Sequence, residues 1–528
     1  MMILRLGKLF IQNTQVVVNM LNITDFVVVA LFFAVVISIS MFKGRREKSG
    51  EDYFLAGRGL SWWIIGISLI AANISTEQFV GMNGAAAGGY GLAIASYDWI
   101  AAITLVVVAV FFLPILLRCG IYTIPEFLEY RFNSHARSIM SFYMMAIYVG
   151  VTISAVLYSG GLTINTIFGI PLTQSVWVVG IIAAAYTAYG GLKSVAWADL
   201  FQGTSLIIGG IFVAFVGIQA VGGLESFATH NEEHLHMFLP SDHDTLPWTA
   251  LLFGLWIPNL YYWGFNQYIA QRTLAAKDLK NGQLGVLMAA GIQVILPIAI
   301  VVPGLIALQL YPDEVAANSD TAFPMLIAKL IGPGMRGFIF AAIAGAIISS
   351  LASMLNSAST IFTMDVFKRH LKPDASQETL VKTGRMMTIV FTIIGCLIAP
   401  HLGQYKGIFN FMQDLQGYVS PGILAVFIFG FFVKKAGSHT AIAGLLLCPV
   451  AYGILHMEMF DSIAFLNKMA ITFSAVVIAM IFTTMIKPRA TIVPLPVKEQ
   501  FDEKTEPMVK IIGAIIVIIT LSLYIIFI

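Results

Sequence analysis

Long apolar segments separated by short polar joints run along almost the whole chain. A helix that crosses the hydrocarbon core of a bilayer needs about 20 apolar residues. Of the 528 residues in the chain, 58% are hydrophobic and only 11% are charged, whereas a soluble chain is typically about 25% charged. Such a composition cannot cover a surface exposed to water, so it excludes a soluble enzyme, a nucleic-acid-binding protein and a disordered chain. The pattern predicts a polytopic membrane protein.

Fourteen segments have the length and polarity of membrane spans. Each is expected to be helical, because lipid offers no partner for unpaired backbone groups and a barrel would show alternating polarity. The predicted spans are residues 24–42, 62–83, 90–117, 137–167, 172–189, 197–222, 247–270, 282–310, 337–366, 381–400, 407–433, 438–456, 465–486 and 510–528. The predicted fold class is therefore an all-α polytopic membrane protein.

The positive charges test this count, since Lys and Arg collect on cytoplasmic loops. With the loop 43–61 taken as cytoplasmic, most of the 30 Lys and Arg residues fall on cytoplasmic joints. Both termini are then expected to face outward. No phosphate-binding glycine loop of the P-loop kind occurs in the sequence. Any transport is therefore expected to be driven by a gradient rather than by ATP.

The second predicted span is too polar at its centre to face lipid. Its sequence AANISTEQ places Asn73, Ser75, Thr76, Glu77 and Gln78 together, and polar residues inside a span normally face protein or water. This pattern is typical of a discontinuous helix, whose freed carbonyls can hold a cation and whose amides can hold a solute. The alternative is an unbroken polar helix packed inside the bundle.

The seventh predicted span, GLWIPNLYYWGFNQYIAQR, combines a proline with amides and aromatic rings. Pro258 is expected to break its hydrogen-bond ladder, and Asn259 and Tyr262 lie beside that break. Amides and flat aromatic faces suit a neutral polyol, although aromatics also form belts at the membrane interface. Asp98, in the third span, is either a helix-start acid favoured by the helix dipole or an acceptor for a solute hydroxyl.

Three further spans carry polar residues of interest. Ser349 and Ser350 open a run of hydroxyls in the ninth span, and oxygen ligands suit a hard cation such as Na⁺, by analogy with hard divalent cations. Asp199, at the start of the sixth span, is either a helix-start acid or a residue on a cation path. Gln413 enters the eleventh span shortly before a second expected break at Pro421.

The segments that carry these residues resemble the sodium:solute symporter family, most closely its bacterial sodium/glucose–galactose branch. The matching stretches are EDYFLAGRGLSWW, SLIAANISTEQFVGM, GIYTIPEFLEYRF, YGGLKSVAWADLFQ, NLYYWGFNQYIAQRTLAAK, SSLASMLNSASTIFTMD and VSPGILAVF. The resemblance implies about 14 helices around a leucine-transporter-like core of two inverted five-helix repeats. The implied divisions are an extension (1–23), a first span and loop (24–61), repeats at 62–222 and 247–433, and peripheral spans at 438–528.

The resemblance also implies site residues, position by position. Sodium would be held by three backbone carbonyls and two hydroxyls, those of Ala71, Ile74, Ala346, Ser349 and Ser350. The sugar site would be formed by Asn73, Gln78, Asp98, Asn259, Tyr262, Gln293 and Gln413. Met82, Tyr97 and Phe409 match an outer hydrophobic gate, Tyr262 matches an aromatic gate on the cytoplasmic side, and Asp199 matches an acid implicated in sodium passage.

Three positions depart from the sugar branch. Asp98 stands where that branch has Glu, Ala101 where it has Ser, and Gln293 where it has Lys. Asp shortens the reach of the carboxylate by one methylene group, and Gln removes a charged donor but keeps a donor and an acceptor. The sodium positions are unchanged, so sodium coupling is expected, whereas these departures leave the solute open.

The expected function is Na⁺-coupled symport of a neutral sugar, a galactose- or glucose-type hexose, by alternating access in a bacterial inner membrane. Na⁺ is the expected coupling ion, and the bilayer is the expected surroundings. No cofactor, enzyme activity or nucleic-acid partner is expected. Inositol, sialic acid, proline and pantothenate stay open as alternative solutes. The absence of a basic residue from the span interiors argues against a carboxylate solute, although broken-helix N-termini can bind anions.

Overall fold

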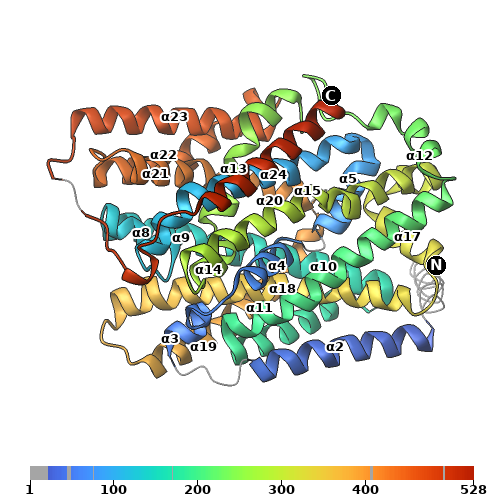
Figure 1. The fold of residues 1–528 in the computed structure, drawn as a ribbon, viewed down its shortest axis with the longest axis horizontal. Helices are drawn as coiled ribbons and strands as arrows, with labels where there is room; N and C mark the ends of the chain where they lie inside the picture. The colour runs from blue at the N-terminus through green and yellow to red at the C-terminus, as the bar shows by residue number, and fades with distance from the viewer. Residues whose placement is uncertain (1–21, 44–48, 75–76, 169, 405–407, 492–493) are drawn as a thin grey trace, which may run out of the picture.

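The apolar segments fold into long helices lying side by side in an elongated bundle (Figure 1). The structure is a computed structural model that describes residues 22–43, 49–74, 77–168, 170–404, 408–491 and 494–528. Many large apolar side chains on its outer helices are exposed, such as Leu31, Phe215 and Ile518. An exposed apolar surface of this kind faces lipid rather than water. The predicted all-α membrane fold is confirmed.

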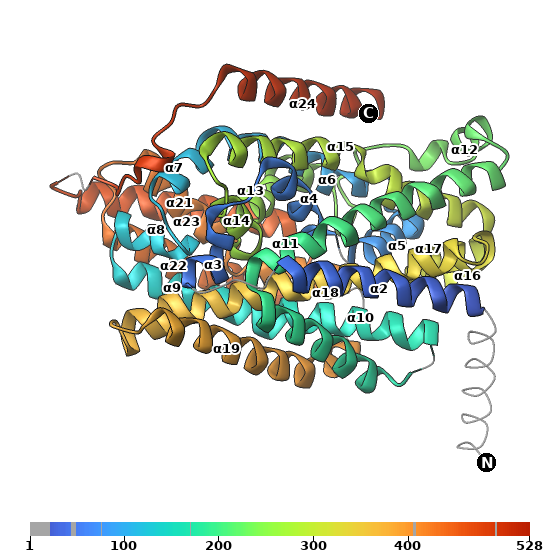
Figure 2. The same ribbon diagram turned by 60° about the horizontal axis from the view of Figure 1, so that its bottom comes forward.

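The first half of the chain forms α2 (Ile23–Lys43), α3 (Gly50–Leu55), α4 (Trp62–Asn73), α5 (Asn83–Ala85), α6 (Ser96–Val107), α7 (Leu113–Arg118), α8 (Ile124–Arg131), α9 (Ser134–Ile147), α10 (Ile153–Phe168), α11 (Leu172–Ala220) and α12 (Leu224–His230). The second half forms α13 (Trp256–Phe265), α14 (Gln267–Leu274), α15 (Leu279–Leu310), α16 (Pro312–Ala317), α17 (Ala322–Leu330), α18 (Met335–Ile361), α19 (Gln377–Ile398), α20 (Ile408–Gln416), α21 (Ser420–Phe432), α22 (Ser438–Ile454), α23 (Phe465–Ile486) and α24 (Pro507–Ile526). Figure 2 shows α24 on the outside of the bundle.

By length and composition, ten helices of the described chain can cross a membrane, or eleven if a bent pair counts as one span. The bent pair is Asn410–Gln416 with Ser420–Phe432, at 44°. The remainder of the predicted fourteen correspond to shorter helices, because α4 has 12 residues, α22 has 17, and α13 and α14 share one predicted span. Interruption, rather than missing apolar sequence, accounts for the difference.

Close approach of small residues holds α4 in the centre of the bundle. A Cβ added to Gly203 of α11 would stand 2.5 Å from the Cβ of Ala71. On the other side, a Cβ added to Gly285 of α15 would stand 2.7 Å from the Cβ of Ile65. In lipid, such contacts supply the van der Waals packing that associates helices. The helix that ends at the polar AANISTEQ sequence is therefore clamped between α11 and α15.

The N-terminal helix α2 braces two of the core helices. Asp25 accepts backbone hydrogen bonds from Gly334 at 2.7 Å and Gly337 at 3.0 Å, and pairs with Arg336. A carboxylate at a helix start satisfies free N–H groups and is favoured by the helix dipole, so Asp25 caps α18. At the other end of α2, Ser40 and Ser194 each donate a hydrogen bond to the other's carbonyl, joining α2 to α11.

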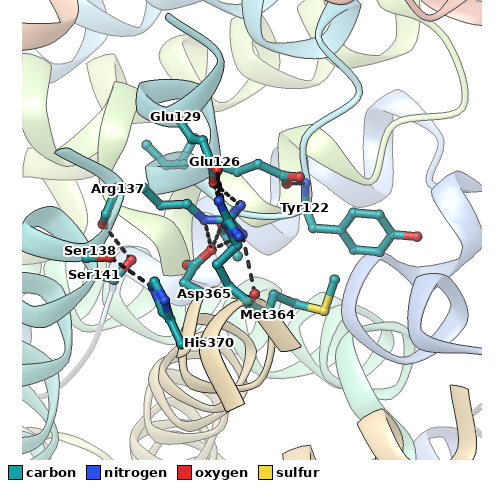
Figure 3. A network of polar contacts seen from close by, with 12 residues as sticks. Tyr122, Glu126, Glu129, Arg137, Ser138, Ser141, Met364, Asp365 and His370 are labelled. Carbon is teal, nitrogen blue, oxygen red and sulfur yellow. Dashed lines mark hydrogen bonds and ion pairs between the residues drawn. The ribbon is translucent and has the colours of Figure 1, made fainter. Parts of the chain in front are cut away.

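Ion pairs gather at the end of the bundle that the charge pattern places in the cytoplasm (Figure 3). The Arg137 guanidinium binds Asp365 of the π-helical segment Phe362–Leu371 and, at 2.9 Å, Glu129 of α8. Arg369 also binds Glu129, at 2.6 Å. The Thr123 hydroxyl donates to the same Asp365 oxygen that Arg137 contacts. Asp365 is thus buried and paired.

Glu129 makes this network sensitive to acid. Burial raises the pKa of Glu129, but hydrogen bonds from Arg369 and Arg137 outweigh it, so the pKa lies below the usual range. A lowered folded-state pKa stabilises the fold above the unfolded-state pKa, about 4.3, and that stability is lost as the pH falls. We expect Glu129→Gln to lower the melting temperature at pH 7 by about 2–4 °C. The difference in melting temperature between wild type and Glu129→Gln should become smaller as the pH falls from about 5 to 3.

Thermal unfolding of the detergent-purified protein across that pH range measures the effect. Glu378→Gln is the matched control, because Glu378 is 77% exposed and pairs only with Lys382, four residues along the same helix. Exposed pairs of this kind contribute about 0.3–0.5 kcal/mol, so the control should melt close to wild type. A Glu129→Gln deficit that stays constant from pH 7 to pH 3 would contradict the assignment.

Candidate functional site

Two helices of the core, α4 and α13, end at an extended residue. After α4 the backbone turns extended at Ile74, with φ −77° and ψ 112°. Between α13 and α14 it does so at Asn266, with φ −75° and ψ 122°. The expected break at Pro258 is wrong, because the backbone is helical on both sides of it, in the π-helical turn Ala250–Gly254 and in α13. The interruption comes eight residues later, where no proline marks it.

A cavity that is partly open to solvent lies beside these interruptions, with about 680 Å³ of space not filled by protein atoms, open solvent included. All seven residues named for a sugar site line it, namely Asn73, Gln78, Asp98, Asn259, Tyr262, Gln293 and Gln413. Met82 and Tyr97, named for the outer gate, line it as well. Phe409, the third gate residue, has a side chain outside the described part of the chain.

The cavity is also lined by residues that the sequence analysis did not predict as site residues. Thr152 reaches it from a π-helical turn between α9 and α10, and Tyr268 from α14. The Tyr268 hydroxyl donates a 2.6 Å hydrogen bond to the Tyr262 hydroxyl, which joins rings from both sides of the Asn266 interruption. A single Thr in an apolar span gives no signal, whereas Tyr268 lay within the aromatic run and could have been included.

Asp98 lies in the first turn of α6, which begins at Ser96 rather than two turns earlier as expected. Although it occupies a helix start, its side chain is inside the protein, with a residue exposure of 2%. The neighbouring Trp99 donates its indole N–H to the Val294 carbonyl at 3.1 Å. This bond fixes α6 against α15, so Asp98 and Gln293 are held on adjoining helices at the wall of the cavity.

The residues named for sodium lie apart from the cavity lining, where α4 and α18 are in contact. Ser349 and Ser350 are both fully buried. The Ser349 hydroxyl donates to Asp199, whereas the Ser350 hydroxyl has no hydrogen-bond partner among the described residues. A buried hydroxyl oxygen without a partner is a fitting ligand for a cation. Ile74 supplies the extended backbone at this point, and Ala71 and Ala346 are also buried.

Asp199 sits in a fully buried ion pair that the sequence did not predict. Its Oδ2 accepts from Arg272 at 2.8 Å and from the Ser68 hydroxyl at 2.5 Å. Arg272 also donates to the Tyr268 carbonyl and the Ser353 hydroxyl. The expectation of no basic residue in the span interiors is therefore wrong, because Arg272 was assigned to a cytoplasmic joint and is 0% exposed. A role for Asp199 in sodium passage stays a prediction.

The interrupted helices, the cavity and the bundle around them define a class, that of multi-pass membrane carriers with a leucine-transporter-like fold. The sodium:solute symporter family model matches residues 53–448, three quarters of the chain. The protein belongs to this family, and its members couple solute transport to Na⁺. It is a Na⁺-coupled solute symporter and not an enzyme.

Relatives with assigned names span most of the chain. The sodium/glucose cotransporter of Vibrio parahaemolyticus is 42% identical over 88% of this chain and 91% of its own length. The sodium/myo-inositol cotransporter 2 of Bos taurus is 34% identical over 80% of this chain and 68% of its own length. A solved Na⁺-coupled sialic acid symporter, in a substrate-bound outward-open state, superposes with a TM-score of 0.81. It is 23% identical, and the match covers 90% of this chain and 99% of that one.

Removing one partner of the buried Asp199–Arg272 ion pair should have a large effect on the stability of the protein. Removing one partner of a buried ion pair typically costs about 3–5 kcal/mol, because the other charge is left uncompensated. We expect Arg272→Met to lower the melting temperature of the purified protein by about 3–5 °C. Thermal unfolding in detergent measures the change.

The double variant Asp199→Asn with Arg272→Gln is the matched control. It removes both charges and keeps polar groups at both positions, so it should recover more than half of the loss caused by Arg272→Met. If the double variant melts no higher than Arg272→Met, the loss comes from missing contacts of the long side chain rather than from the unpaired charge on Asp199.

Proposed function

We propose that this symporter carries a neutral sugar of the hexose type into the cell, one solute molecule with Na⁺, by alternating access. The observation that carries the proposal is the convergence of amides and aromatic rings on one cavity beside both interruptions. Amides such as Asn73, Gln78, Asn259 and Gln413 can exchange donors and acceptors with hydroxyl groups. Tyr262 and Trp263 offer flat faces for the apolar side of a sugar ring.

The named relatives support a polyol as the solute. The Vibrio parahaemolyticus relative is named for glucose and the Bos taurus relative for myo-inositol. Both solutes are rings bearing several hydroxyl groups, which the same side chains can bind. myo-Inositol is therefore the second candidate. Sialic acid, proline and pantothenate carry a carboxylate, and no basic residue is found among the described residues that line the cavity, so these solutes are less favoured.

In the proposed cycle, Na⁺ binds where α4 meets α18, with the carbonyls of Ala71, Ile74 and Ala346 and the hydroxyls of Ser349 and Ser350 as ligands. The ion would order the backbone after Ile74, and Gln78 lies directly along that backbone. Na⁺ can promote sugar binding only if it prefers the outward, sugar-competent state. The proposed location is the plasma membrane, as for the family, and specifically the inner membrane of a bacterium.

The driving force is sufficient for concentrative uptake. One charge crossing 100 mV supplies about 2.3 kcal/mol, and each tenfold sodium gradient supplies about 1.4 kcal/mol. Together these give about 3.7 kcal/mol, which at one-to-one coupling would concentrate the sugar several-hundred-fold.

Replacing Ser350 with Ala should weaken the sodium dependence of transport. The unpartnered hydroxyl is the proposed ligand, and a bond to a charged group is worth about 1.5–3 kcal/mol. We expect the Na⁺ concentration for half-maximal hexose uptake into proteoliposomes to rise about tenfold or more. The matched control is Ser474→Ala, whose hydroxyl is exposed and bonds only to the Ala470 carbonyl. Wild-type uptake that is indifferent to Na⁺ would refute the proposal.

Replacing Gln78 or Asn259 with Ala should weaken sugar binding at saturating Na⁺. Each substitution removes an amide from the cavity wall, and we expect the half-saturating sugar concentration to rise about tenfold. The sodium dependence should change much less. Gln219→Ala, an exposed residue at the end of α11, serves as control. Equal uptake by all three variants and wild type would place the sugar elsewhere in the molecule.

A further inference from the structure

The described wall of the cavity carries one formal negative charge and no formal positive charge. Among the described residues that line it, Asp98 is the one residue with a formal charge, and none is Lys, Arg or His. Arg272, a buried cation described above, forms an ion pair with Asp199 and is not among the residues that line the cavity. The described lining therefore presents one acid, amides, hydroxyls and aromatic rings, with no internal cation to balance the acid.

One carboxylate oxygen of Asp98, the buried Oδ2, has no hydrogen-bond partner among the described residues, and no ion pair reaches the carboxylate. On α15, Gln293 is 0% exposed, and both its Oε1 and its Nε2 lack hydrogen-bond partners among the described residues. Gln78 Oε1 is buried and unpartnered as well. Buried polar atoms are almost always satisfied, and an unpaired buried charge is strongly unfavourable. These atoms are therefore available for hydrogen bonds or an ion pair with a bound ligand.

We propose that the preferred solute is a sugar that carries a protonated amino group, with the ammonium on Asp98. This inference rests on the proposed sugar transport and changes the preferred solute from a neutral hexose to a hexose with one positive charge. An ammonium has three donors and no acceptor, and the cavity offers three unpartnered oxygens, on Asp98, Gln78 and Gln293. Hydroxyl groups of the same sugar would take the Gln293 amide N–H and the amides of Asn259 and Gln413.

The aromatic lining is compatible with a cation. Tyr262, Trp263 and Tyr268 line the cavity, and Tyr262 meets the other two rings edge to face, with centroids 5.2 Å and 5.7 Å away. Aromatic faces attract ammonium groups. The same faces accept the apolar side of a sugar ring, so one surface serves both parts of an amino sugar.

Binding to the purified full chain at saturating Na⁺ tests this proposal, with tryptophan fluorescence as the signal because Trp263 lies in the cavity wall. The probes are glucose, glucosamine and N-acetylglucosamine, and the corresponding galactose series. They share a ring, and acetylation removes the charge while it keeps the nitrogen. We expect the free amine to bind about tenfold more tightly than the parent hexose. The acetylated sugar should lose that advantage.

Variants assign the preference to the carboxylate. Asp98→Asn should bring the amine-to-hexose affinity ratio close to one, and Asp98→Glu should keep it above one. Gln293→Lys should also abolish the preference, because it supplies an internal ammonium opposite Asp98. Asn259→Ala is the matched control, since it should weaken both sugars and leave the ratio unchanged. If Asp98→Asn fails to fold, Gln293→Lys decides the question.

The outcomes separate the two proposals. Na⁺-driven uptake of glucose or galactose with no preference for the amine would overturn the inference and leave the proposed function standing. A preference that survives both Asp98→Asn and Gln293→Lys would also overturn it. Loss of Na⁺ binding in Asp98→Asn, measured without sugar, would make Asp98 a ligand of the metal ion and overturn the amine assignment. Absence of Na⁺-dependent uptake for every sugar would overturn the proposed function itself.

Discussion

Inside a helical bundle surrounded by lipid, a polar atom must find its partner in the chain or in a bound ligand. The described interior of this protein divides along that line. Arg272 makes hydrogen bonds to four groups and neutralises Asp199, so this cluster is complete without a ligand. Gln293 and Asp98, by contrast, have unpartnered atoms in the wall of the cavity. In the proposed function, these atoms are free to bind the solute.

The interruptions at Ile74 and Asn266 make this division possible. A continuous helix satisfies its own backbone and presents only side chains, whereas an extended residue frees carbonyls and N–H groups in the middle of the membrane. Each interruption needs rigid neighbours to keep its two halves aligned. Gly203 and Gly285 provide this for α4 by letting α11 and α15 approach its backbone closely. The proposed sodium position and the proposed sugar cavity thus both border the end of α4.

Much of this arrangement could be predicted from the sequence, because long apolar runs and clustered polar residues are strong local signals. The amide-rich AANISTEQ sequence located the first interruption. The interruption in the seventh predicted span was misplaced, since the backbone stays helical through Pro258 and the sequence around Asn266 holds no proline that would mark a break. Arg272 was taken for a loop residue because its partner Asp199 is 73 positions away. Pairings between distant segments depend on how helices pack, which no local pattern specifies.

The packing of α8 shows how the cavity is connected to the cytoplasmic network. Gln267, the first residue of α14, accepts from the Ile124 N–H at 2.7 Å and donates to the Tyr122 carbonyl at 3.3 Å. At the other end of α8, Arg131 donates to the carbonyls of Gly430 and Val433, and so caps α21. In the proposed cycle, any tilt of α14 that opens the cavity inward must therefore carry α8 with it or break the two bonds of Gln267. The first course would displace Glu129, which lies on α8, relative to its partners Arg137 and Arg369, and would so couple opening of the cavity to this network.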